Sequence, residues 1–157
     1  MQLLMFTVAG EAYAIESRRV VEVLPLVPAR PIPHTPGYVR GVFTYRGSLV
    51  PLIDLGRRLA DAPLAERLST RVIVVDYLPG GGARPGQLGL VAENVISIVA
   101  AERAETALPP LELAEAAFLG RILRIAGRTV QVVEVDRLLP ADLAAGLFPQ
   151  GPAEAAS

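Results

Sequence analysis

The sequence predicts an all-β protein built from two small barrels that pack on each other, with short helical turns. Short β-prone runs recur along the 157 residues and are bounded by glycine-containing turns. Hydrophobic residues make up 52% of the chain and charged residues 20%, so there is ample apolar surface for a buried core or for a partner. The order of features in the first half returns in the second half, which indicates an internal repeat.

Three strands are expected before the proline-rich segment: Leu3–Val8, Glu11–Ile15 and Val20–Leu24. The first two would form a hairpin around Ala9-Gly10, and the third carries one polar residue, Glu22, among valines. Five prolines then lie in the segment from Pro25 to Gly37, and they forbid regular strand pairing. We expect a rigid surface connection there, with a ligand for a proline-binding domain as the alternative.

The stretch from Val39 to Leu55 has the sequence VRGVFTYRGSLVPLIDL, and the rest of the chain is organised around it. β-Branched and aromatic runs flank Arg46-Gly47, which predicts two strands joined by a tight turn. Asp54 closes the second strand and is placed to cap a helical turn over Leu55–Leu59. No residue pattern in this stretch indicates catalysis.

The remaining β-prone runs are Arg71–Tyr77, Leu88–Ala92, Val95–Val99, Leu119–Ile125 and Thr129–Val135. The glycines of Leu78–Gly86 predict a hairpin loop, because neither a GK[ST] sequence nor a following helix supports a phosphate cradle. Ala100–Ala117 should be a mixed linker. Asp136 is placed to cap a closing helix, and the tail, residues 150–157, is expected to be disordered.

The repeat is clearest when Gly47 is aligned with Gly127, 80 positions later. Asp54 then falls on Glu134, and apolar pairs coincide along both stretches. Earlier in each half, AYAIESRRVVEVL aligns with QLGLVAENVISIV. Each half offers about five strands, too few to bury a core alone, so the two subdomains, roughly residues 1–70 and 71–143, should share one core within a single domain of residues 1–149. Interleaved and sequential subdomains are both open, and chance similarity between β-rich halves is the alternative.

Composition argues against several classes of function. The formal net charge is -1 and the basic residues are scattered, which argues against a nucleic-acid binder. The chain has no cysteine, no lysine and one histidine, His34, so we expect no catalytic activity, no metal and no cofactor. The start of the chain lacks signal-peptide features, and no apolar run reaches the roughly 18 residues that span a bilayer. A cytoplasmic protein is therefore expected.

Several motifs, in order, resemble the CheW-like domain of bacterial chemosensory arrays. They are FTVAGEAYAI, the V-x-E-V of Val20–Val23, the PGYVRGV approach, YRGSLVPLIDL and LRIAGRTVQVVEVDRLL. The resemblance covers Leu3 to about Leu143. It implies two five-stranded SH3-like barrels around a shared hydrophobic core, which agrees with the repeat.

The resemblance also implies a function: a non-catalytic adaptor that couples the cytoplasmic tips of chemoreceptors to the regulatory domain of a CheA-type histidine kinase. The chain length leaves room for neither a kinase core nor a receiver domain, so a free-standing adaptor, recruited to membrane-associated receptor arrays, is expected. Two departures stand out. Thr44-Tyr45-Arg46-Gly47 replaces the N-L-R-G of many members, and Ala92-Glu93 replaces a V-D pair. These differences resemble adaptors of alternative arrays that control surface behaviour or second-messenger synthesis.

Candidate site residues follow from the same resemblance. Glu22 and Arg46 match the family's paired Glu and Arg beside the receptor-binding groove, and we expect an ion pair between them. Gly47 and Gly127 are expected at the hairpin turns. A helical receptor tip would dock between the two barrels, against four apolar residues, which are Val20, Val42, Leu90 and Val91. The alternatives are that Arg46 is an ordinary turn residue and that some of the apolar side chains belong to the core.

The kinase should use a different surface from the receptor, because an adaptor must hold both partners. The YRG-to-PLIDL half and the RIAG-to-VVEV half are the two candidate surfaces. A competing function is an SH3-like module that binds proline-rich peptides. Such grooves need an aromatic cluster, and only 5% of these residues are aromatic.

Overall fold

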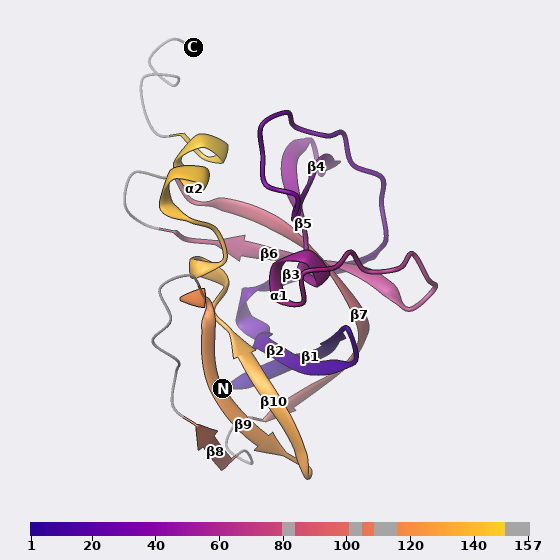
Figure 1. The fold of residues 1–157 in the computed structure, drawn as a ribbon, viewed down its shortest axis with the longest axis vertical. Helices are drawn as coiled ribbons and strands as arrows, with labels where there is room; N and C mark the ends of the chain where they lie inside the picture. The colour runs from indigo at the N-terminus through magenta and orange to yellow at the C-terminus, as the bar shows by residue number, and fades with distance from the viewer. Residues whose placement is uncertain (80–83, 101–104, 109–115, 150–157) are drawn as a thin grey trace.

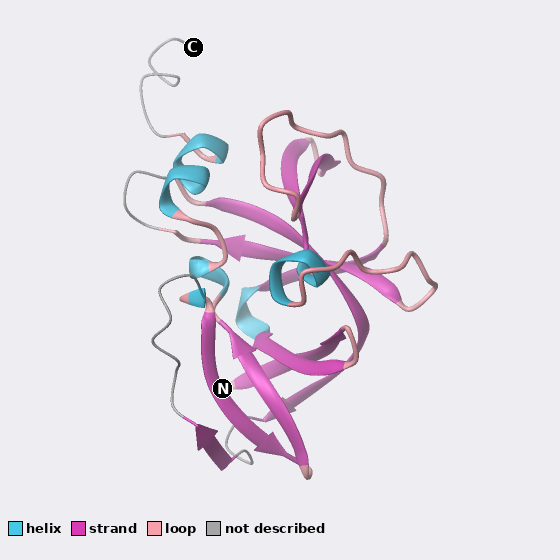
Figure 2. Cartoon of the chain, in the orientation of Figure 1, coloured by secondary structure: helices cyan, strands magenta, loops and turns pink. Residues whose placement is uncertain are grey.

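The computed structural model describes residues 1–79, 84–100, 105–108 and 116–149, and this part of the chain is mainly β (Figures 1 and 2). The expectation of a mainly β fold is therefore confirmed. The strands are β1 (Gln2–Val8), β2 (Glu11–Glu16), β3 (Val20–Pro25), β4 (Val39–Tyr45), β5 (Ser48–Asp54), β6 (Thr70–Tyr77), β7 (Gly86–Ala100), β8 (Glu105–Leu108), β9 (Leu119–Ile125) and β10 (Arg128–Val133). The short helical segments are η1 (Ser17–Arg19), α1 (Leu55–Leu59), η4 (Val135–Arg137) and α2 (Ala141–Leu147).

Strand pairing divides the sheet into two groups that share β7. The first part of β7 pairs antiparallel with β6 and parallel with β5, and its last part pairs antiparallel with β1. Strands β3 to β6 form the upper group in Figure 1, and β1, β2, β8, β9 and β10 form the lower one. The pairing does not follow the two sequence halves, because the N-terminal hairpin lies beside β10.

Strand β1 is buried on both faces because it contributes to two hydrophobic clusters. Leu3 and Met5 pack with β9 and β10 side chains inside the lower group. Leu4, Phe6 and Val8 point the other way and join the larger cluster that includes the upper group. This alternation is the period-2 geometry of a strand with two covered faces, and it explains why the sequence of β1 reads as a continuous apolar run.

Three hairpins turn on a pair of residues that both have positive φ. The angles are +51° and +82° at Ala9-Gly10, +49° and +82° at Arg46-Gly47, and +52° and +76° at Ala126-Gly127. Two consecutive positive angles define the tight turn whose twist matches that of the flanking strands. Gly47 and Gly127 therefore hold equivalent turn positions in the β4–β5 and β9–β10 hairpins.

The two strands expected at Leu88–Ala92 and Val95–Val99 are one long strand, β7, so that part of the prediction is wrong. The polar Glu93-Asn94 pair suggested a turn. In the structure Asn94 adopts φ +51°, and the pairing with β1 shifts register between Met5 and Thr7. A bulge of this kind bends a strand without ending it, which lets β7 serve both groups.

Three further expectations differ from the structure. Glu105–Leu108, expected to be linker, forms β8 against β9. The last strand ends at Val133 instead of Val135, because η4 begins at Val135. Asp136 caps no helix; Pro140 is at the N-cap of α2 and makes no side-chain cap bond.

No helix in the described ranges has the length and apolar character needed to cross a membrane. Residues 80–83 of the glycine-rich Leu78–Gly86 loop and the tail expected to be disordered lie outside the described residues.

Candidate functional site

The candidate site lies where side chains span the gap between β3 and β4. Within the described residues, β3 pairs only with β6, and β4 pairs with β5. Tyr45 Oη donates a hydrogen bond of 2.6 Å to Glu22 Oε1, and Arg46 Nη2 donates one of 3.0 Å to the same oxygen. The three residues, here called the Glu22 cluster, connect the middle of β3 to the tip of the β4–β5 hairpin.

Tyr45 is the buried residue of the Glu22 cluster, and it holds the other two side chains in position. The Tyr45 ring is buried against Phe43, and the Arg46 guanidinium carbon lies 5.1 Å above the centre of the Tyr45 ring. The hydrogen bond to Glu22 is the main cause that raises the pKa of the Tyr45 hydroxyl, and burial adds to it. The side chains of Arg46 and Glu22 remain 70% and 39% exposed. The cluster therefore presents a positioned cation and a positioned anion to solvent.

The predicted ion pair between Glu22 and Arg46 is present, at 3.0 Å. Tyr45, the third residue of the Glu22 cluster, was not predicted from the sequence. The available signal was the departure from the family pattern, since a tyrosine stands where many members have leucine and supplies a hydroxyl donor.

The four apolar residues expected to line one groove lie in three different environments. Leu90 and Val91 have no exposed surface, because side chains of the main core pack against both faces of this part of β7. They cannot form the floor of an open groove, so the core alternative holds for them. Val20 is partly buried at the start of β3 and packs against the core. Val42 lines an open groove.

The groove at Val42 has a volume of about 690 Å³ and runs between β4 and the proline-rich segment. Its lining is mainly apolar and comprises Val27, Pro28, Ala29, Arg30, Val42, Phe43, Thr44 and Leu49. Arg30 and Val42 exchange two backbone hydrogen bonds, of 2.8 and 2.9 Å. A side chain at Gly41, which has φ +138°, would place its Cβ 2.0 Å from the Arg30 carbonyl oxygen. Only glycine lets the proline-rich segment approach β4 this closely.

Asp54 fixes the far end of the β4–β5 hairpin, as the sequence predicted. Its Oδ1 accepts hydrogen bonds of 2.9 and 3.3 Å from the amides of Gly56 and Arg57, which caps α1. Its Oδ2 accepts a 2.9 Å hydrogen bond from Nε of Arg40 and forms an ion pair with Nη2 of the same arginine at 2.8 Å. The carboxylate is 1% exposed, so the hairpin carrying the Glu22 cluster is anchored by a fully bonded buried charge.

Arg58 contacts residues from both halves of the chain. Its guanidinium carbon lies 4.7 Å from the centre of the Tyr38 ring and 4.3 Å from that of Phe118, and its Nε donates a 2.8 Å bond to the Leu138 carbonyl. Burial lowers the pKa of the guanidinium, and nearby Tyr38 opposes this shift. Arginine is suited to such a position because its planar group both stacks and donates.

Within the described ranges, His, Asp and Glu side chains form no group of three or more that could hold a metal ion. In the Glu22 cluster an arginine and a hydroxyl both donate to one carboxylate oxygen. This arrangement suits recognition of another surface, because charged hydrogen-bonding groups beside an apolar groove give orientation and specificity.

Known proteins match this chain along most of its length. The model of the CheW-like domain family matches residues 2–142. Chemotaxis protein CheW of Rhizobium meliloti (strain 1021) is 29% identical over 144 residues, covering 90% of this chain and 88% of that protein. Chemotaxis protein CheW of Treponema pallidum (strain Nichols) is 30% identical over 114 residues, covering 69% and 63%. Protein FrzA of Myxococcus xanthus is 30% identical over 106 residues, covering 68% and 62%.

A solved structure shares the fold. The crystal structure of scaffolding protein TtCheW from Thermoanaerobacter tengcongensis superposes with a TM-score of 0.73 at 23% sequence identity, covering 90% of this chain and 88% of that one. The strand arrangement described above is thus that of a known scaffold protein. Since the family model spans residues 2–142, this chain belongs to the CheW-like domain family.

Proposed function

We propose that this protein is a non-catalytic adaptor that couples chemoreceptor cytoplasmic tips to a CheA-type histidine kinase. It acts in the cytoplasm and is recruited to membrane-associated receptor arrays. The observation that carries the proposal is the family match over residues 2–142 together with relatives named chemotaxis protein CheW. The Glu22 cluster adds the expected Glu–Arg pair at the surface.

The receptor tip docks at the hairpin end of the upper strand group in this proposal. Val42 and the exposed Leu49 provide apolar surface there, and Glu22 and Arg46 provide a polar border. A helical tip needs this combination of an apolar floor and a charged rim. Tyr45 orients the Glu22 carboxylate and does not itself need to touch the partner.

A binding experiment separates this function from a peptide-binding module. The full chain is titrated by calorimetry with a receptor-tip fragment, a kinase regulatory domain and a proline-rich peptide. We expect binding of the first two and no binding of the peptide. Binding of the peptide alone would support the SH3-like module and overturn the adaptor.

The Glu22 cluster is tested by replacing its anion. Glu22→Arg places a second guanidinium beside Arg46, and we expect the affinity for the receptor tip to fall at least about tenfold. Glu66→Arg is the matched control, because Glu66 is exposed and lies outside the cluster. Its affinity should stay within about twofold of wild type. Equal losses in both variants would show a general charge effect and would reject this site.

Simultaneous binding is the remaining requirement for an adaptor. Saturating receptor tip should leave the affinity for the kinase regulatory domain unchanged, because the two partners use different surfaces. Displacement of the kinase domain by the tip would mean that the surfaces overlap, and the adaptor proposal would fail.

A further inference from the structure

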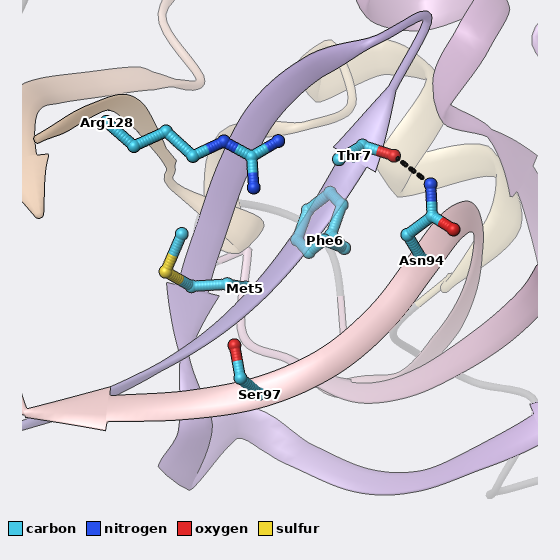
Figure 3. A pocket seen from close by; sticks show the side chains of 6 residues that line it. All are labelled: Met5, Phe6, Thr7, Asn94, Ser97 and Arg128. Atoms are coloured by element: carbon cyan, nitrogen blue, oxygen red, sulfur yellow. Dashed lines mark hydrogen bonds between the residues drawn. The ribbon is translucent and has the colours of Figure 1, made fainter. Parts of the chain in front are cut away.

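A second cavity opens in the lower strand group, between β1, β7 and the start of β10 (Figure 3). It has a volume of about 180 Å³. Met5, Phe6 and Thr7 of β1 form its buried floor. Its exposed rim consists of Asn94 and Ser97 of β7 and Arg128 at the start of β10.

Arg128 supplies the only formal charge among the described residues that line this cavity. Within the described residues, no hydrogen bond or ion pair satisfies its guanidinium. Figure 3 shows the group reaching across the β1–β2 hairpin toward Phe6 and Thr7. A guanidinium presents five donors in a plane, and its best match is a carboxylate, which can accept two of them in parallel.

The part of the rim opposite Arg128 is formed by Asn94, whose position depends on a positive φ angle and a hydrogen bond. Asn94 adopts φ +51° at the bulge of β7, and its Nδ2 donates a 2.9 Å hydrogen bond to Thr7 Oγ1. The Thr7 hydroxyl in turn donates to the Glu93 carbonyl, at 3.4 Å. This chain fixes the Asn94 amide beside the cavity, and the Ser97 hydroxyl provides a further donor. Among the described residues, the cavity therefore combines one unpaired cation with neutral polar groups and no anion, which favours an anionic guest.

We propose that this cavity receives an acidic side chain of a protein partner, whose carboxylate is bound by Arg128. The proposal rests on the adaptor function and assigns the RIAG-to-VVEV half, rather than the YRG-to-PLIDL half, to the kinase regulatory domain. A volume of about 180 Å³ suits one side chain and is below the range of roughly 300 to 1,000 Å³ typical of small-molecule sites. The receptor surface at the β4–β5 hairpin shares no described residue with this cavity and stays free while the cavity is filled.

The first test removes the charge with Arg128→Gln in the full chain. We expect the affinity for the kinase regulatory domain to fall at least about tenfold, as for loss of one partner of a buried charge pair, with receptor-tip affinity unchanged. Arg121→Gln is the matched control, since Arg121 is an exposed arginine of the same hairpin that does not line the cavity. It should leave both affinities unchanged.

The second test determines the sign of the charge on the bound group. Asparagine and aspartate both tolerate positive φ, so Asn94→Asp keeps the backbone of the bulge while adding a negative charge at the rim. The variant lacks the Nδ2 donor, so the Thr7 hydroxyl turns from the Glu93 carbonyl to donate to the new carboxylate. An acidic guest should then bind the cavity more weakly, which supports the proposal. Tighter binding of the kinase domain would show a cationic guest and would overturn it.

The outcomes also separate this inference from the proposed function. If wild-type protein binds neither partner, the adaptor function itself fails. If wild-type protein binds both and Arg128→Gln binds both equally well, the adaptor stands and this cavity is not the contact. Circular dichroism and thermal melting of each variant confirm that the fold is retained.

Discussion

The β4–β5 and β9–β10 hairpins share the same turn conformation but differ in what their side chains bind. Each turns on a residue pair with positive φ, and an acidic residue follows each glycine by seven positions, Asp54 after Gly47 and Glu134 after Gly127. In the first hairpin the arginine, Arg46, precedes the turn glycine and bonds to Glu22. In the second, Arg128 follows the glycine.

The acidic residues differ as strongly as the arginines. Asp54 is buried and caps α1 while it pairs with Arg40. Glu134 is exposed and makes no side-chain cap bond to η4. Its neighbour Asp136 binds other segments instead, accepting from Arg19 and from the Leu78 amide. In the first hairpin the acidic residue therefore makes local contacts, whereas after the second hairpin Asp136 joins distant segments, and this difference fits the proposal that the two hairpins serve different partners.

The largest expected difference in stability is between the two variants that remove the equivalent carboxylates of Asp54 and Glu134. Asp54→Ala leaves Arg40 and the first amides of α1 without their buried acceptor, so the free energy of unfolding should fall by about 3 to 5 kcal/mol. Glu134→Ala removes an exposed side chain and should change it by less than about 0.5 kcal/mol. Urea unfolding of both variants measures the difference, and similar losses would contradict the asymmetry.

The second prediction concerns Tyr77, which lies near the Asp136 contact. Burial raises the pKa of Tyr77 to about 12, and Asp136 and Tyr38 contribute to the rise. Between pH 10 and about 12 the unfolded chain loses this proton while the folded protein keeps it, so stability is retained below pH 10 and falls as the pH rises. The loss should reach about 2 kcal/mol.

Tyr77→Phe is the control for that titration, because it keeps the ring and removes the ionisable group. Urea midpoints measured from pH 8 to pH 11 should decline less steeply in the variant than in wild type. Identical pH profiles would show that Tyr77 does not contribute.

The third prediction tests whether the two turns are energetically equivalent. A Cβ at Gly47 or at Gly127 would meet no atom within 4 Å, so only the positive φ opposes a side chain there. Gly47→Ala and Gly127→Ala should each lower the free energy of unfolding by about 1 to 2 kcal/mol. Thermal unfolding of the pair measures this, and a clearly larger loss in one would show that its turn carries additional strain.

Much of the fold was predictable because it depends on local patterns. Glycine turns, alternating apolar residues and the Asp54 cap act over a few positions, so the hairpins and α1 were expected from sequence. The continuity of β7 was not predictable, since Glu93-Asn94 is as suitable for a turn as for a bulge, and only pairing with β1 selects the bulge. The grouping of β1 and β2 with β10 is likewise a long-range choice.

The site was predictable in part for the same reason. The Glu22–Arg46 pair followed from a family motif and the chemistry of the two side chains. Leu90 and Val91 were misplaced because strand sequence does not say whether a face is covered, and β7 is covered on both sides there. Tyr45 and the Arg128 cavity were missed because each depends on residues brought together from separate strands.

The smallest expected effect compares the two hairpin tips through their arginines. Arg46→Gln loses an exposed ion pair with Glu22, which should cost about 0.2 to 1 kcal/mol, whereas Arg128→Gln loses no described bond and should leave the melting temperature unchanged. A double-mutant cycle with Glu22→Gln isolates the Arg46 contribution, because Tyr45 can still donate to the side-chain amide oxygen that this variant carries in place of the carboxylate. A coupling energy near zero would mean that Tyr45 alone holds Glu22. A loss of stability in Arg128→Gln would show instead that its guanidinium supports the lower strand group and is not free for a partner.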